Sequence, residues 1–369
     1  MKKLYLALIL VFIFASSCTL VKTLYYNKAD IDDHAIFKYR EVKTGEHQEW
    51  ELSENYNKNT ILSNYIPIIL EYETASYLVV HKGKILHEEY WGKYNKDSYT
   101  NSFSMSKSFV SLLIGFAIDD GVIKGVDQKA ADFLDYFKES DKANISIKDL
   151  LTMSSSLNWK ESYNSPFGNT AKSYYGKNLE KIIKKLPADS IHGEKFAYSS
   201  GDTQILALII EKATGKSLSD YMSEKLWQAL GTKHIARWSI DKKDGHEKAF
   251  CCFNSNARDF AKIGQFILQT GKWNGKQLLS ESYIKESLAP ATHIKFGEKP
   301  VEFYGYQWWM IKHKEMDVKF ARGLFGQYIF IIPEKDLVIV RLGHKRSSAS
   351  VKGVPADVLM WLDIAFEMI

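Results

Sequence analysis

The chain is poor in cysteine, in proline and in charge of one sign. It has three cysteines and seven prolines among 369 residues, and its formal net charge is +5. The neighbours Cys251 and Cys252 do not suggest a disulfide framework, so we expect two buried thiols. Lysines are interspersed with acids, which excludes the continuous basic surface that nucleic-acid binding requires. The ten histidines show no HExxH-like spacing, so we predict no metal site and no cofactor.

The chain has enough apolar residues to form a large core, since 45% of its residues are hydrophobic and 14% are aromatic. The N-terminus carries two lysines, then an apolar stretch over residues 4–14, then small residues before Cys18. This order is typical of a secretory signal over residues 1–17, and the stretch is too short for a stop-transfer helix. The cysteine also resembles the end of a bacterial lipobox. We therefore expect export, with lipidation at Cys18 anchoring the protein to a membrane; cleavage with Cys18 incidental is the alternative.

The remaining sequence divides into an expected tether and irregular extension over residues 18–70 and one domain over residues 71–369. Alternating apolar residues predict a hairpin over 76–91 and strands over 304–311, 327–332 and 337–342. Helical periodicity predominates between these strands, over 109–119, 147–153, 179–185, 203–213, 218–230 and 257–270, and returns over 356–369. We predict an α+β fold, in which N- and C-terminal segments form one antiparallel sheet and a mostly helical subdomain is inserted at about 120–260.

Three segments of the chain place a lysine three residues after a serine. They begin at Ser104, Ser239 and Ser282. Only Ser104 directly precedes a long apolar helix, where Ser104 and Lys107 would share one face. A lysine in an apolar pocket has its ammonium form disfavoured, so it can take the proton of a serine nucleophile. Context therefore favours Ser104 as nucleophile and Lys107 as base.

Further motifs follow in an order that resembles the serine β-lactamase-related superfamily, in the branch of class C β-lactamases, esterases and 6-aminohexanoate-dimer hydrolases. After Ser-Met-Ser-Lys at 104–107 they are Asp-Leu-Leu-Thr-Met at 149–153, Gly-Glu-Lys-Phe-Ala-Tyr-Ser-Ser at 193–200 and Ala-Arg-Asp-Phe-Ala-Lys-Ile-Gly at 257–264. The resemblance covers roughly residues 75–365. It implies the β-lactamase/transpeptidase fold, and it maps the family's Tyr-x-Asn motif onto Tyr198, with Ser200 in place of asparagine. A phenol beside Lys107 is suited to share its proton and to protonate a leaving group; the alternative for Tyr198 is a core aromatic with a satisfied hydroxyl.

Acyl transfer also needs two hydrogen-bond donors for the carbonyl oxygen. The N–H of Ser104, at a helix start, is one plausible donor. The resemblance implies that the second is the N–H of Leu324, after Ala321-Arg322-Gly323 in the place of the family's Lys-Thr-Gly or His-x-Gly motif. Ala321 stands where β-lactamases use a cationic or imidazole side chain. This departure disfavours efficient β-lactam hydrolysis but leaves ester and amide hydrolysis open.

Four residues near these motifs are candidates for substrate contact. They are Tyr163, Ser200, Arg322 and Gly323; Tyr163 is equally explained as a surface aromatic on a loop. The leading hypothesis is an exported serine hydrolase of a small ester, amide or cell-wall peptide. The alternatives are a D-amino-acid peptidase or β-lactamase acting through the same residues, and a non-catalytic cell-wall-binding protein on the same scaffold.

Overall fold

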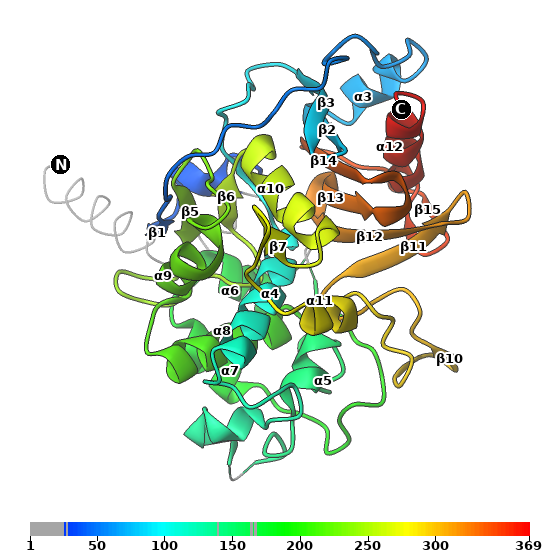
Figure 1. Cartoon of the computed structure of the whole chain (residues 1–369). Helices are drawn as coiled ribbons and strands as arrows, with labels where there is room; N and C mark the ends of the chain where they lie inside the picture. Colours follow the sequence, from blue (N-terminus) through cyan, green and yellow to red (C-terminus); the bar gives the residue numbers. More distant parts are fainter. Residues whose placement is uncertain (1–25, 27–28, 139, 163–164, 166–167) are drawn as a thin grey trace, which may run out of the picture.

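A six-stranded antiparallel sheet forms one side of the molecule and a group of helices forms the other (Figure 1). The computed structural model describes residues 26, 29–138, 140–162, 165 and 168–369. The strand order is β11-β12-β13-β14-β2-β3. Two strands come from the N-terminal part, β2 (Thr74–His81) and β3 (Lys84–Tyr90), and four from the C-terminal part, β11 (Trp309–His313), β12 (Met316–Gly323), β13 (Gln327–Ile332) and β14 (Leu337–Gly343). Pairing of β2 with β14 joins the two ends of the chain and confirms the predicted α+β architecture.

Both faces of the sheet are covered, because alternate residues of its strands point to opposite sides. Leu78, Ile329 and Val340 face the main core, where α10 (Ala257–Leu268) and α4 (Met105–Asp119) pack. Their neighbours Val79 and Ile339 face a second core under α12 (Asp357–Phe366). The central strands are consequently apolar almost throughout, with every residue of β13 and β14 buried.

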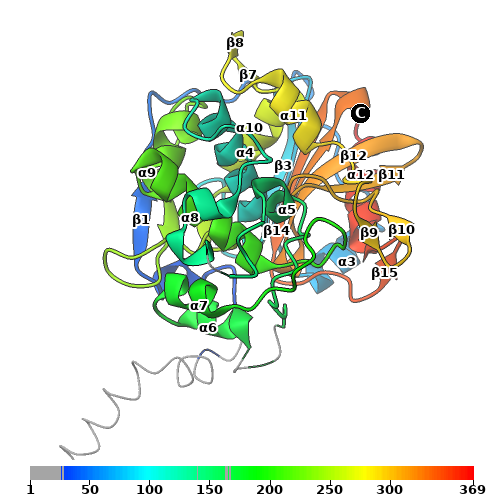
Figure 2. The same ribbon diagram turned by 90° about the horizontal axis from the view of Figure 1, so that it is seen from below.

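The helical part surrounds α4, which is buried from Met105 to Ala117 (Figure 2). Apolar residues all round a helix require partners on every side. α4 packs against α8 (Ser200–Thr214), against α11 (Glu281–Ser287) and against β12 of the sheet. The other helices of this part are α5 (Ile147–Leu151), α6 (Asn169–Tyr175), α7 (Leu179–Lys185), α9 (Leu218–Met222) and the π-helical turn η4 (Ser223–Trp227).

A second, four-stranded sheet leads the chain to the start of α4. Its order is β1-β5-β6-β4, formed by β1 (Tyr39–Val42), β5 (Ala236–Ser239), β6 (Phe253–Ser255) and β4 (Thr100–Asn101). Because β1 pairs with β5 and α3 (Ile66–Glu71) packs on β2, part of the expected extension over residues 18–70 is integrated into the domain. The expected signal over residues 1–17, and Cys18, lie outside the described residues.

Several expectations need correction. The strand predicted over 304–311 begins only at Trp309, since Tyr304 and Trp309 form an isolated bridge across a tight turn. α6 and β12 were not predicted from periodicity. Cys251 and Cys252, expected as thiols, are joined in a disulfide, and both are buried.

Short hairpins complete the described structure: β7 (Lys272–Trp273) with β8 (Lys276–Gln277), β9 (Lys295–Phe296) with β10 (Lys299–Pro300), and β15 (Ser350–Val351) with β16 (Val354–Pro355). None of the described helices is long and apolar enough to cross a membrane.

Candidate active site

Ser104 is the cap residue at the start of α4, three residues after the end of β4. The preceding Phe103 has a φ of 45°, in the left-handed region that a bulky residue rarely adopts. Its N–H donates to Oδ1 of Asn101 at 3.0 Å, which holds this turn in place. Ser104 itself is half-buried, whereas Phe103 and Met105 on either side of it are buried. The fold thus leaves the serine accessible at a tightly held corner.

Lys107 lies one helical turn further on, on the same face as Ser104. Its side chain is 1% exposed, and its Nζ lies 2.9 Å from Oγ of Ser104. The same Nζ donates to the carbonyl of Phe250 at 2.7 Å. Burial lowers the pKa of Lys107 to about 8, against a smaller opposing effect of the Glu161 carboxylate. A substantial neutral fraction near pH 8 is what a base for the serine proton needs.

Tyr198 lies across from Lys107, just before α8. Nζ of Lys107 is 5.2 Å from the centre of the Tyr198 ring. Burial raises the pKa of Tyr198 above its usual value, the Glu161 carboxylate raises it further, and a hydrogen bond with Ser104 opposes both. The phenol is therefore kept protonated beside the serine. The structure thus places Ser104, Lys107 and Tyr198, the three predicted catalytic residues, close to one another.

The other two serine-lysine pairs do not form such a site. Ser239 is the last residue of β5, and Lys242 reaches away to Oδ1 of Asn178. Ser282 lies on α11, where Lys285 is paired with Glu281. Within the described residues, Ser104 and Lys107 are the one pair of the three in which the lysine donates a hydrogen bond to the serine.

The end of β12 comes close to the corner that carries Ser104. A Cβ on Gly323 would lie 2.3 Å from the carbonyl oxygen of Ser102, so only glycine fits there. The next residues form the turn η5 (Leu324–Gly326), in which the ring of Phe325 packs edge-on against Phe103 with centroids 5.5 Å apart. The predicted second donor, the N–H of Leu324, thus belongs to a turn that packs on the residue before Ser104.

Comparison with known proteins assigns this arrangement to a family. The family model described as Beta-lactamase matches residues 69–358. The chain belongs to the Beta-lactamase family. It is 26% identical over 286 residues to the 6-aminohexanoate-dimer hydrolase of Paenarthrobacter ureafaciens, covering 73% of this chain and 72% of that protein. The superfamily resemblance expected from the motifs is thereby confirmed.

Solved structures agree with the fold. A proposed 6-aminohexanoate-dimer hydrolase from Bacillus anthracis superposes with a TM-score of 0.74 at 22% identity, over 90% of this chain and 91% of that one. A family VIII carboxylesterase superposes with a TM-score of 0.66 at 14% identity, over 87% and 99% of the two chains. Family membership places this chain among serine hydrolases of the β-lactamase fold.

Two of the predicted substrate-contact residues have defined partners in the structure. Ser200 is 1% exposed and its hydroxyl donates to Oε1 of Glu161 at 2.9 Å. The guanidinium of Arg322 lies 4.4 Å from the centre of the Trp309 ring, and the centre of the Tyr198 ring lies 5.7 Å from the same ring. Arg322 and Tyr198 therefore both lie next to the Trp309 ring, which places Arg322 near the site. Tyr163 lies outside the described residues.

Sequence reasoning missed three groups around the reacting residues. Glu161 accepts hydrogen bonds from Nε1 of Trp159 at 2.7 Å and from the N–H of Ser200 at 3.0 Å. Oδ1 of Asn101 accepts from the N–H of Cys252 at 3.1 Å as well as from Phe103, and the carbonyl of Phe250 accepts from Lys107. Glu161 lies in a segment without periodicity and the Phe250 contact is through its backbone, so no side-chain pattern pointed to either.

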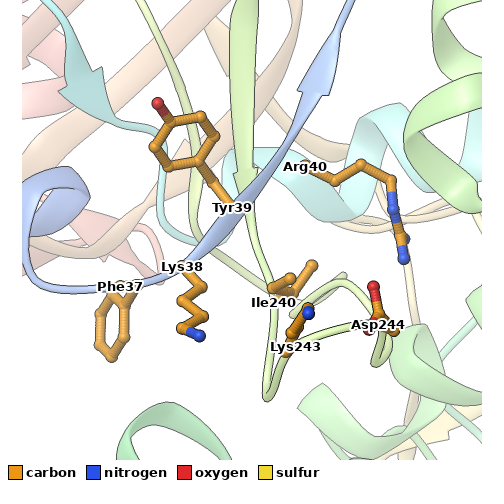
Figure 3. A pocket seen from close by; sticks show the side chains of 7 residues that line it. All are labelled: Phe37, Lys38, Tyr39, Arg40, Ile240, Lys243 and Asp244. Atoms are coloured by element: carbon orange, nitrogen blue, oxygen red, sulfur yellow. The ribbon is translucent and has the colours of Figure 1, made fainter.

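A hollow of about 580 Å³ elsewhere on the surface is separate from this site (Figure 3). It is lined by Phe37, Lys38, Tyr39, Arg40, Ile240, Lys243 and Asp244. These residues lie at or next to β1 and the end of β5, whereas Ser104 follows β4 at the opposite edge of the same sheet. The Arg40 guanidinium is already paired with Glu247, at 2.6 Å.

Proposed function

We propose that the chain is a serine hydrolase that cleaves a small ester or amide through an acyl-enzyme on Ser104. Neutral Lys107 takes the hydroxyl proton as Oγ attacks the substrate carbonyl carbon, and the N–H groups of Ser104 and Leu324 bind the resulting oxyanion. Collapse breaks the bond to the alcohol or amine, which leaves with a proton delivered through Tyr198. Water then attacks the ester on Ser104, and the acid is released.

The observation that carries the proposal is the buried Lys107 with its Nζ 2.9 Å from the serine oxygen. With a pKa of about 8, roughly a tenth of the lysine is neutral at pH 7. The tyrosine stays protonated over the same range because its pKa is raised. One residue is thus ready to accept a proton while the other holds one to donate.

The substrate class follows from what the end of β12 presents. Ala321 is fully buried in the main core, and its methyl group supplies no positive charge at this position of the strand. A β-lactam carboxylate would find no lysine or histidine there, so ester and amide substrates are favoured over β-lactams. A peptidase acting on cell-wall peptides shares the same residues and is separated from the leading proposal by experiment.

The test is covalent labelling followed by mass spectrometry. The protein is incubated with a fluorophosphonate and, separately, with a labelled penicillin, with Ser104→Ala as the matched control. We expect the phosphonate adduct on Ser104 and little or no penicillin adduct. Efficient penicillin labelling would favour the peptidase, and a folded protein that neither reagent labels at Ser104 would favour the non-catalytic binder.

We also propose that the protein is exported and anchored through lipid on Cys18. The charged, apolar and small-residue order of residues 1–18 supports this. Mass spectrometry of the mature N-terminus tests it, with Cys18→Ser as the control. A mature chain that begins at an unmodified Cys18 would support export but contradict the lipid anchor.

A further inference from the structure

Arg341 is a fully buried arginine on the face of the sheet that lies away from α4. It is 0% exposed, in β14, and its guanidinium lies 5.0 Å from the centre of the Trp361 ring of α12. Its partners are backbone carbonyls and one hydroxyl. Nη1 lies 2.8 to 3.0 Å from the carbonyl oxygens of Phe325, Gly326 and Lys345, and Nη2 lies 2.9 Å from the carbonyl oxygen of Tyr72 and Oγ1 of Thr74.

Two glycines leave the space that this guanidinium occupies. A Cβ on Gly326 would lie 2.6 Å from Nη1, and a Cβ on Gly343 would lie 2.5 Å from Nη2. Gly326 also has a φ of +80°, which side chains rarely adopt. The turn η5 and the end of β14 are therefore shaped around the arginine.

Every carbonyl of η5 is held by a side chain. Arg341 binds those of Phe325 and Gly326, and Nε2 of Gln327 donates to that of Leu324 at 3.0 Å. Gln327 is itself fixed, because it donates to the carbonyl of Gly343 and accepts from the N–H of the same residue. Phe325 has a φ of 61°, so the turn adopts a conformation that needs such support.

Stability alone gives little reason for an arginine at this position. Desolvating a guanidinium is costly, and well-packed apolar side chains often serve as well or better in such places. The neighbours of Arg341 on the same strand face, Ile339 and Leu337, are apolar and fully buried. What Arg341 adds over an apolar residue is directed hydrogen bonding. Part of it goes to Tyr72, Thr74 and Lys345, and part goes to two carbonyls of η5, the turn that packs on Phe103 beside the nucleophile.

We propose that Arg341 is a positioning residue of the oxyanion hole: through the carbonyls of Phe325 and Gly326 it fixes η5, so that the N–H of Leu324 stays directed at the substrate carbonyl oxygen. This inference rests on the proposed function, because it assigns Leu324 the role of second donor. Arg341 touches no substrate and acts from behind the sheet. Loss of one oxyanion donor typically lowers kcat by about 10²–10³-fold, and a displaced donor by less.

The test compares Arg341→Met, which keeps the length of the side chain but removes its donors, with Arg341→Lys, which keeps a charge and some donors. Turnover of a p-nitrophenyl ester and the rate of phosphonate labelling at Ser104 are measured on each full-length protein, with folding checked by near-UV circular dichroism. For Arg341→Met we expect kcat and the labelling rate to fall about 10–100-fold, with KM changed less than about 3-fold. Arg341→Lys should recover part of this loss.

Ile339→Ala is the matched control, because it weakens the same strand and the same core without touching η5. It should lower thermal stability but leave kcat of the folded enzyme unchanged. If Arg341→Met does not fold, Gln327→Leu tests the same turn, and an equal fall in kcat is expected. Full kcat in a folded Arg341→Met or Gln327→Leu protein, with wild type labelled normally at Ser104, would overturn the Arg341 inference alone. A wild-type protein that is not labelled at all would overturn the proposed function and this inference together.

Discussion

The two walls of the candidate site are built in different ways. The wall formed by α4 and the segment before α8 presents the side chains of Ser104, Lys107 and Tyr198, and burial lowers the pKa of Lys107 and raises that of Tyr198. The wall formed by η5 presents backbone, and its geometry depends on side chains that never reach the site, Gln327 and Arg341. The reacting side chains thus all lie in the first wall. The position of the second wall depends instead on side chains that lie outside the site.

Removal of the nucleophile gives the largest effect and tests the first wall directly. We expect Ser104→Ala to lower ester turnover by about 10⁴-fold or more, because no acyl-enzyme can form. Steady-state kinetics measure the loss. Ser111→Ala, on the same helix and fully buried, is the control and should keep its turnover. Undiminished turnover in Ser104→Ala would show that another residue is acylated.

Removal of the base gives the next largest effect. Lys107→Met should lower kcat/KM by about 10²–10⁴-fold, and the wild-type rate should rise with pH through about 8, as Lys107 becomes neutral. Lys262→Met is a close control, because Lys262 is also buried and its pKa is also lowered to about 8, while its ammonium donates to the carbonyls of Gln48 and Gly231, away from Ser104. If both variants lost activity equally, burial of a lysine, rather than its contact with Ser104, would explain the result.

The same substitution should stabilise the fold at neutral pH. The folded pKa of Lys107 is lower than the unfolded value of 10.5, so the unfolded chain binds more protons between about pH 8 and 10.5 and wild-type stability rises with pH there. Below pH 8 the full penalty of charging a buried lysine remains. Lys107→Met removes it, and we expect a Tm at pH 7 about 2–4 °C higher, measured by calorimetry. An unchanged Tm at pH 7 and at pH 10 would contradict this account.

Tyr198→Phe should have a smaller effect than loss of the base. It removes the phenolic proton but keeps the ring packing against Trp309, so we expect kcat to fall about 10–10³-fold with the fold unchanged. The loss should be greater for amides than for p-nitrophenyl esters, because an amine needs a proton to leave and nitrophenolate does not. Tyr304→Phe, a buried tyrosine with its ring 6.4 Å away, is the control. Equal losses on both substrate classes would argue against a role in leaving-group protonation.

The difference between the walls also explains how far the sequence could be read. The spacing of Ser104 and Lys107 and the helix that follows Ser104 involve residues close together in the sequence. So do the β2–β3 hairpin and the β13–β14 hairpin. All of these could therefore be predicted from the sequence. Arg341 could not be, because its partners at Tyr72 and Phe325 reach it only through the pairing of β14 with β2 and β13. The same holds for Glu161, which meets Ser200 across 39 residues. The Cys251–Cys252 disulfide was missed because neighbouring cysteines give no spacing signal.

The smallest expected effect concerns Glu161, which influences the first wall through its charge. Its carboxylate raises the pKa of Lys107 and of Tyr198. Glu161→Gln removes that charge, and an amide can still accept from Ser200, so we expect the pH at half-maximal kcat/KM to move down by a few tenths of a unit to about one unit. The exposed Glu298→Gln should leave the profile in place. A profile that moved up, or not at all, would mean that Glu161 acts on the lysine through structure rather than charge, and that the protonation of this wall is set by burial alone.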